Sequence, residues 1–325
     1  MSSSSSSLAQ TTGGATRAPR RRLTLDRVSF FAVFLGLPLL LYVYLVISPI
    51  LQSFYYSMTS WTGFQSNPAF VGLQNYSALV HDDLFWRALR NNAILATVLP
   101  IITIGLALAL ATIVTVGGSS RGQTRGIRGG GIYRVVSFFP YAIPAIVTGI
   151  LWAQIYSPQG GLLNGFLDGI GLDNLKNTPW LGDPNLALGA IVVAIVWSFV
   201  GFYMILFVAA IKGIPAEIYE AARLDGSSRL RTAVQITIPL IRDNVSTAIV
   251  YMAIFGLDAF TFMAILAPNG GPDNQALVVS QYLYQQAFTK GKFGYAISMG
   301  VVLALVTLAV SIGVLLSSRR KEVEL

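Results

Sequence analysis

The sequence predicts an all-α integral membrane protein, and three observations support this prediction. Of its 325 residues, 54% are hydrophobic and only 11% are charged, whereas soluble domains carry about 25% charged residues. Six apolar stretches are each long enough to cross about 30 Å of hydrocarbon as a helix. The basic residues lie almost entirely in the tails and in alternate loops between these stretches. The chain is therefore expected to cross a membrane six times.

The six predicted spans follow one another with polar loops between them. They run from Phe30 to Phe54, Ala93 to Val116, Val135 to Tyr156, Leu186 to Ile211, Val245 to Leu266 and Tyr295 to Leu316. The first is about 25 residues long, against the 7 to 15 apolar residues of a secretory signal, so it is expected to stay as a helix. We divide the chain into a disordered basic tail (1–28), a transmembrane domain (29–318) and a short C-terminal tail (319–325).

The distribution of basic residues predicts the orientation. All but five of the 22 Lys and Arg residues lie in the two tails or in the loops after the second and fourth spans. The exceptions are Arg87, Arg90, Lys176, Lys290 and Lys292. Because positively charged loops stay in the cytoplasm, we expect both termini and the loop at 211–243 to be cytoplasmic. This predicts a multi-pass protein of the cell (cytoplasmic or inner) membrane.

Several function classes find no support in the sequence. With no cysteine and one histidine, His81, neither a disulfide nor a metal cluster is expected. The basic residues do not alternate with aromatic ones, so nucleic acid is not an expected partner. Arg128-Gly129-Gly130-Gly131 lacks the spacing of a phosphate-binding loop. A membrane-embedded enzyme would need a catalytic cluster, and the spans contain no His, Cys or paired carboxylates.

The loop at 211–243 predicts a hairpin of two short helices. Pro215 suits a first helical turn, Asp225-Gly226 supplies a break, Ser227 or Ser228 can cap the next helix, and Pro239 is expected to stop it. Apolar residues at three- and four-residue steps predict one buried stripe on each helix. The stripes comprise Ile211, Ile214, Ile218 and Ala221, and then Leu230, Ala233 and Ile236.

The same loop resembles the signature loop of permeases of ATP-binding-cassette (ABC) importers. The residues at the family spacing are Glu220, Ala221, Ala222, Gly226, Ile236 and Pro239, and the departure is Ile238 in place of Leu. Three further motifs resemble carbohydrate-type permeases, and more the first than the second of two paired subunits. They are Phe70-Val71-Gly72-Leu73-Gln74-Asn75-Tyr76, Gly160-Gly161-Leu162-Leu163-Asn164 and Gly270-Gly271-Pro272, with departures at Ser227 and Asn269.

The resemblance implies a transport subunit without an enzymatic activity or cofactor of its own. It implies import of a sugar, oligosaccharide or related polyol, together with a second permease, two ATPase subunits and an external solute-binding protein. ATP and Mg²⁺ would be bound by the ATPase, and the hairpin would dock on it with Glu220 and Gly226 at its centre and with Asp225 among the coupling residues. The alternative is an ion-coupled secondary transporter or a channel.

Asp258 is the one charged residue within the predicted spans, so it is expected to face protein or water. With Thr261 and Tyr251 on the same predicted helix, it suits hydrogen bonding to a neutral solute, or to a neighbouring helix. A lone acid is less typical of an ion relay, which usually has other ionisable partners.

Other residues of the spans are candidates for the solute path. Pro140 and Pro144 are expected to break the third span near its start, and Gly201 to interrupt the fourth. Aromatic faces for stacking on a sugar are offered by Trp197, Tyr203 and Tyr295, although such residues also serve simply as packing.

Overall fold

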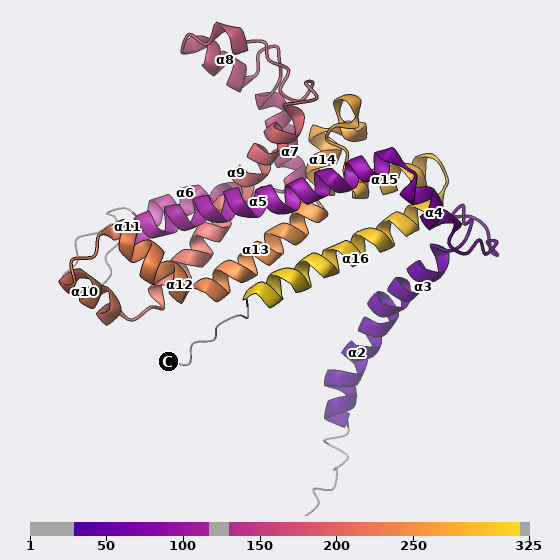
Figure 1. Cartoon of the computed structure of the whole chain (residues 1–325), viewed down its shortest axis with the longest axis horizontal. Helices are drawn as coiled ribbons and strands as arrows, with labels where there is room; N and C mark the ends of the chain where they lie inside the picture. Colours follow the sequence, from indigo (N-terminus) through magenta and orange to yellow (C-terminus); the bar gives the residue numbers. More distant parts are fainter. Residues whose placement is uncertain (1–28, 117–129, 319–325) are drawn as a thin grey trace, which may run out of the picture. The chain divides into compact units, whose positions relative to one another are not determined.

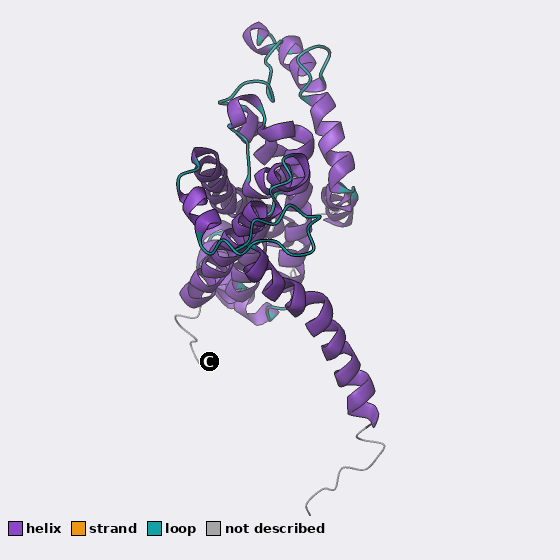
Figure 2. Ribbon diagram, turned by 90° about the vertical axis from the view of Figure 1, so that its right-hand side faces the viewer, coloured by secondary structure: helices purple, strands orange, loops and turns teal. Residues whose placement is uncertain are grey.

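The computed structural model describes residues 29–116 and 130–318. Within these ranges the regular structure is helical, apart from one isolated bridge between Thr59 and Phe70 (Figure 2). The all-α prediction is confirmed for this part of the chain. The predicted tails at 1–28 and 319–325, and the basic residues from Arg121 to Arg128, lie outside the described residues.

Residues 1–52 and 53–325 form two compact units. In the first unit the described residues make an apolar helical segment in which no residue is buried. It consists of a π-helical turn (Ala32–Gly36), α2 (Leu37–Tyr42), a second π-helical turn (Val43–Ile47) and the beginning of α3 (Ser48–Tyr56), which ends in the second unit.

The second unit holds all the remaining described α-helices (Figure 1). In order they are α4 (Gln74–Val80), α5 (Asp83–Val116), α6 (Gly130–Ala142), α7 (Ala145–Ile155), α8 (Leu162–Gly169), α9 (Ala187–Lys212), α10 (Ala216–Leu224), α11 (Arg229–Thr232), α12 (Ile238–Leu240), α13 (Arg242–Leu257), α14 (Phe260–Leu266), α15 (Val279–Tyr284) and α16 (Phe293–Ser318). A π-helical turn (Ala233–Thr237) joins α11 to α12, and another (Gln285–Thr289) follows α15.

Four helices in the described ranges are long and apolar enough to cross a membrane, and two bent helix pairs bring the total to six if each pair is one span. The bends are 97° between α6 and α7 and 76° between the helix ending at Leu240 and α13. Five of these candidates overlap the predicted spans, but the second bent pair begins in the hairpin at Arg229 and ends at Leu257, so it covers only the first part of the predicted fifth span, Val245 to Leu266. The second helix begins at Asp83 rather than Ala93, because its first turns carry polar residues that hydropathy assigns to a loop.

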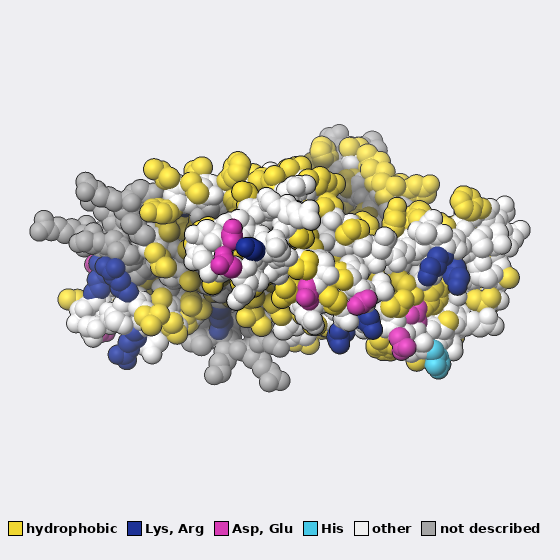
Figure 3. Space-filling model, turned by 90° about the horizontal axis from the view of Figure 1, so that it is seen from above, with side chains coloured by type: hydrophobic (Ala, Val, Ile, Leu, Met, Phe, Trp, Pro, Cys, Tyr) yellow, Lys and Arg dark blue, Asp and Glu magenta, His cyan; other side chains and the backbone are white. Residues whose placement is uncertain are grey.

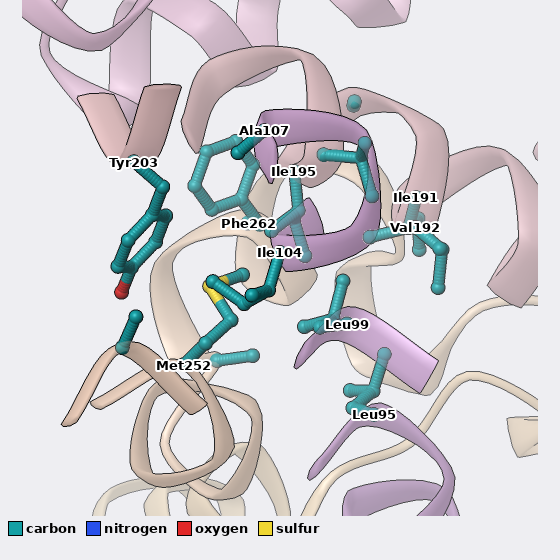
Figure 4. Close-up of a cluster of buried hydrophobic side chains, with 14 of the residues drawn as sticks. Leu95, Leu99, Ile104, Ala107, Ile191, Val192, Ile195, Tyr203, Met252 and Phe262 are labelled. Carbon is teal, nitrogen blue, oxygen red and sulfur yellow. The ribbon is translucent and has the colours of Figure 1, made fainter. Parts of the chain in front are cut away.

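The main core of the second unit lies where α5, α9, α13 and α14 meet. Its buried side chains include Leu95 and Leu99 of α5, Ile191 and Ile195 of α9, and Phe262 of α14 (Figure 4). Helix α9 is apolar all round and more than half buried, as expected for a helix enclosed by others. This core therefore holds α5, α9, α13 and α14 in fixed positions relative to one another.

The expected interruption of the fourth span at Gly201 is wrong, since α9 runs unbroken from Ala187 to Lys212. Gly201 is buried instead at the crossing with α6, where a Cβ would overlap the carbonyl oxygen of Ser137. Glycine here permits two helices to approach closely. The sequence alone does not distinguish this role from that of a helix breaker.

The expected break in the third span is confirmed, in the middle of the span rather than near its start. Pro140 lies within α6, which ends at Ala142, and Pro144 is the N-cap of α7 with an extended ψ of 137°. Proline favours this position because it has no N–H to donate and restricts the preceding residue to extended backbone.

The predicted fifth span is also broken, although the sequence predicts one continuous helix there. α13 ends at Leu257, Asp258 follows with φ −119° and ψ 39°, and α14 begins at Phe260. Tyr251 and Thr261 thus belong to different helices, and the expectation that they share one helix with Asp258 is wrong. The break contains neither Pro nor Gly, so no local signal marked it.

Candidate functional site

The turn of the hairpin at 211–243 is closed by backbone hydrogen bonds and a glycine in the left-handed region. Gly226 has φ +73°, and its N–H donates to the carbonyl of Arg223 (3.0 Å) while that of Ser227 donates to Ala222 (2.9 Å). This is a Schellman arrangement, in which glycine has no steric penalty. Ser228 caps α11, since its Oγ accepts from the N–H of Arg231 at 3.3 Å. The predicted helix, turn and helix are observed.

One face of the hairpin is anchored to the rest of the second unit. Tyr219 is buried in the main core, and its hydroxyl lies 3.2 Å from Oγ1 of Thr237, so α10 is tied to the segment after α11. Burial raises the pKa of Tyr219, and the hydrogen bond to Thr237 offsets part of that rise. Ala222 and Ala233 of the hairpin are buried as well.

The buried stripe differs from the predicted one, because Ala221 and Leu230 are exposed. The face that the hairpin helices bury therefore differs from the face that the three- and four-residue spacing of apolar residues predicts. The helix also continues one residue past Pro239, to Leu240, before the bend into α13. Ile236 is half-buried on this helix.

The other face of the hairpin is exposed and combines apolar with charged side chains. Leu224 is 89% exposed and Leu230 76% exposed. Glu220, Arg229 and Arg231 are exposed as well, and Asp225 is exposed at the turn. Such a face on a fixed hairpin is suited to contact another protein, because exposed leucines gain free energy when a partner covers them.

Asp258 lies at the C-terminal end of α13, beside a cavity of about 490 Å³. The opposite wall is formed by α16, with the hydroxyls of Thr307 and Ser311. Both hydroxyls donate to carbonyls of their own helix, at 2.8 and 2.7 Å, so their lone pairs can still accept. The cavity can thus offer a carboxylate and two hydroxyl oxygens to a polar molecule.

A second cavity, of about 320 Å³, lies at the break between α6 and α7. Its lining includes Tyr141, Thr148 and, from α9, Ser198 and Phe199. Thr148 is fully buried, and its Oγ1 has no hydrogen-bond partner among the described residues. An unpaired buried hydroxyl costs free energy that a polar ligand could recover. Nothing in the sequence singles out Thr148, although the two prolines mark the helix break beside it.

The four predicted solute-path residues do not gather around one cavity. Tyr203 is buried in the main core (Figure 4), and Trp197 is 37% exposed with its ring edge-on to that of Trp152 at 5.7 Å. Tyr295 lies at the start of α16, where its hydroxyl donates to Oδ2 of Asp82 at 2.6 Å. Of the four, only Asp258 lines either of the two cavities described above.

Comparison with known proteins identifies relatives along nearly the whole chain. The family model described as binding-protein-dependent transport system inner membrane component matches residues 113–323. The chain is 51% identical over 307 residues to the diacetylchitobiose uptake system permease protein NgcF of Streptomyces coelicolor, covering 94% of this chain and 86% of that one. It is 29% identical over 293 residues to the multiple sugar-binding transport system permease protein MsmF of Streptococcus mutans, covering 89% and 95%.

A solved structure shares the fold. It is a crystal structure of a bacterial alginate ABC transporter in complex with an alginate pentasaccharide-bound periplasmic protein, with a TM-score of 0.77 at 21% identity, covering 91% of this chain and 96% of that one. The sequence matches, the apolar helices and this shared fold lead to one assignment. The chain is a multi-pass transport permease and belongs to the family of binding-protein-dependent transport system inner membrane components.

Proposed function

We propose that this chain is one of two permease subunits of an ATP-driven importer of a sugar, oligosaccharide or related polyol. A separate ATPase, which binds ATP and Mg²⁺, drives transport, and an external binding protein delivers the solute. The chain itself holds no cofactor or nucleotide. The names of the two sugar permeases it resembles support this solute class, and the 51% identity favours an N-acetylated amino-sugar disaccharide within it.

The observation that carries the coupling role is the exposed face of the hairpin. Leu224 and Leu230 project from the hairpin, which Tyr219 anchors to the core. A movement of a protein bound to these leucines is therefore transmitted to the membrane helices. The ATPase docks here with Glu220, Ala221 and Gly226 at the centre of the contact. Ala222 is buried and Ile236 is half-buried behind this face, Pro239 lies in the last turn of the second helix, and Asp225 ends the first helix.

The solute path runs past the two cavities at the helix breaks. Broken helices are tolerated at membrane depth where the freed backbone groups face protein or a water-filled cavity. Asp258 and the unpaired Thr148 hydroxyl provide hydrogen-bonding groups for a sugar, which carries hydroxyls and no net charge. A role in the solute path has weaker support for Trp197, Tyr203 and Tyr295. Tyr203 is buried, and the hydroxyl of Tyr295 donates to Asp82.

The coupling role can be tested with two matched substitutions on exposed leucines of short helices. Leu224→Asp places a charge in the proposed ATPase contact, whereas Leu162→Asp does so on α8, in the loop after the third span, where Leu162 is 75% exposed. We expect Leu224→Asp to lower the ATPase recovered with the purified permease by at least about tenfold, as loss of a central contact does. Leu162→Asp should leave it unchanged. Equal recovery for both variants would refute docking at the hairpin.

A further inference from the structure

A cleft of about 590 Å³ lies beside α4, which is at the opposite end of the second unit from hairpin helix α10 (Figure 1). It is lined by residues around α4, by the start of α5 and by the segment joining α15 to α16. α5 begins at this cleft and runs for 34 residues, about 50 Å, to the hairpin end. If the hairpin is cytoplasmic, the cleft therefore opens on the external face.

The floor of the cleft is built around Asp82. Its carboxylate accepts four hydrogen bonds: from the N–H groups of Leu84 (2.9 Å) and Phe85 (3.2 Å), and from the hydroxyls of Tyr282 (2.7 Å) and Tyr295 (2.6 Å). Burial raises the pKa of Asp82, but these hydrogen bonds outweigh it and the pKa is lowered. Asp82 thus remains ionised, and its oxygens are occupied by protein donors rather than offered to a ligand.

The rim of the cleft carries two lysines on a rigid turn. Lys290 and Lys292 flank Gly291, which has φ +66°. The turn is closed by hydrogen bonds from the N–H of Lys290 to the carbonyl of Gln285 (3.1 Å) and from that of Lys292 to Gln286 (2.8 Å). Figure 3 shows the histidine side chain on the right with acidic and basic side chains near it, while other charged side chains lie in the middle and at the left.

Among the described residues these two ammonium groups form no ion pair, although Asp82 and Asp83 line the same cleft. The ion pairs found in the described residues are Lys176–Asp168 and Arg242–Asp243, and neither involves Lys290 or Lys292. The ammonium nitrogen of Lys290 instead lies 6.0 Å from the centre of the Tyr282 ring. The side chains of Lys290 and Lys292 are exposed. Two exposed cations on a hydrogen-bonded backbone turn can bind an anionic group that approaches them from outside the cleft.

We propose that this cleft is the docking site of the external binding protein on this chain, and that Lys290 and Lys292 form ion pairs with a carboxylate on a loop of that protein. The proposal rests on the proposed function and names the place of one contact within it. A family that depends on a binding protein needs a docking surface on the external side. The cleft does not share a lining residue with the cavities at Asp258 and Thr148, so its lysines are not placed to hold the solute in the membrane path.

The test uses the complete importer in nanodiscs of phosphatidylcholine and measures ATPase activity against the concentration of solute-loaded binding protein. For Lys290→Glu/Lys292→Glu we expect the half-stimulating concentration to rise at least about tenfold, with the maximal rate retained at saturation. Raising the salt from about 50 to about 300 mM should weaken stimulation of the native importer more than that of the variant. The control is Lys176→Glu, an external lysine outside the cleft, which should change the half-stimulating concentration less than about twofold.

An unchanged half-stimulating concentration in the double variant overturns the proposal. So does an effect that appears only when anionic lipid is added to the nanodiscs, because the lysines would then bind a lipid phosphate. If the charge reversal prevents assembly, Lys290→Gln/Lys292→Gln removes both charges without adding new ones and should raise the concentration at least about threefold. Failure of the proposed function looks different, since the native importer would then show no stimulation at any concentration of binding protein.

Discussion

At the scale of single residues, Asp258 can play either of two parts, and the structure sharpens the distinction. It lies exposed at the end of α13 rather than inside a continuous helix, beside a cavity whose other wall offers hydroxyl oxygens. A carboxylate there can accept hydrogen bonds from a neutral sugar. It could also serve as a proton or ion relay, as in an ion-coupled transporter.

Replacement of Asp258 by Asn and by Leu separates these roles. Asn keeps the shape and a hydrogen-bonding oxygen, so uptake of a neutral sugar should stay within about threefold of the native rate. Leu leaves a solute hydroxyl unpaired at about 1 to 3 kcal/mol, so uptake should fall by roughly 5- to 150-fold. The measurement is uptake of labelled sugar into proteoliposomes with ATP inside, at equal protein content. An Asn variant as inactive as the Leu variant would favour an ion relay, and two fully active variants would remove Asp258 from the path.

At the scale of helices, close approach of α6 to α9 depends on the absence of one side chain. A Cβ on Gly201 would overlap the backbone carbonyl of Ser137, and backbone cannot move aside as a flexible side chain can. Gly105, in contrast, lies exposed in α5 with no atom within 4 Å of an added Cβ. Both glycines occupy helix interiors, so they form a matched pair.

We expect Gly201→Ala to destabilise the protein by about 1 to 3 kcal/mol, the usual cost of overpacking. Gly105→Ala should be neutral or stabilise it by about 0.4 to 1 kcal/mol, because alanine restricts the unfolded chain. Heating the purified protein in detergent and measuring the fraction that stays monodisperse compares the two variants. Similar midpoints for both would mean that α6 and α9 do not pack as closely as described.

At the scale of the whole molecule, orientation in the membrane decides whether the hairpin can reach a cytoplasmic ATPase. The asymmetry of basic residues supports a cytoplasmic hairpin, and the cleft near Asp82 would then be external. The chain has no cysteine, so single cysteines can report exposure without interference.

Asn174→Cys, in the loop after the third span, and Ser227→Cys, in the hairpin, test this orientation. In spheroplasts, a membrane-impermeant thiol reagent should label Cys at position 174 and leave position 227 unlabelled until the membrane is permeabilised. Both positions are at least partly exposed, so access to the reagent depends on the side of the membrane. Labelling of position 227 alone in intact spheroplasts would reverse the orientation, and neither the ATPase contact nor the proposed docking site of the binding protein would survive.

The sequence alone determined the features that depend on local chemistry. Runs of apolar residues predicted the spans, because a membrane helix must satisfy its backbone internally and cover itself with apolar side chains. Pro144 predicted the break between α6 and α7, and Asp225-Gly226 predicted the turn of the hairpin, because each residue type restricts or frees its own backbone. The signature spacing around Glu220 identified the family that the comparisons confirm.

Only the tertiary structure decided the features that depend on what lies opposite a residue. The break at Asp258 has no proline or glycine to mark it, and Gly201 is a contact point rather than a hinge because Ser137 lies across from it. Tyr295 was expected near the solute and instead donates to Asp82, which is 213 residues away in the chain. The sequence does not predict that the Thr148 hydroxyl is unpaired either. Its possible hydrogen-bond partners come close only when the chain folds, so the spacing of residues along the chain does not reveal them.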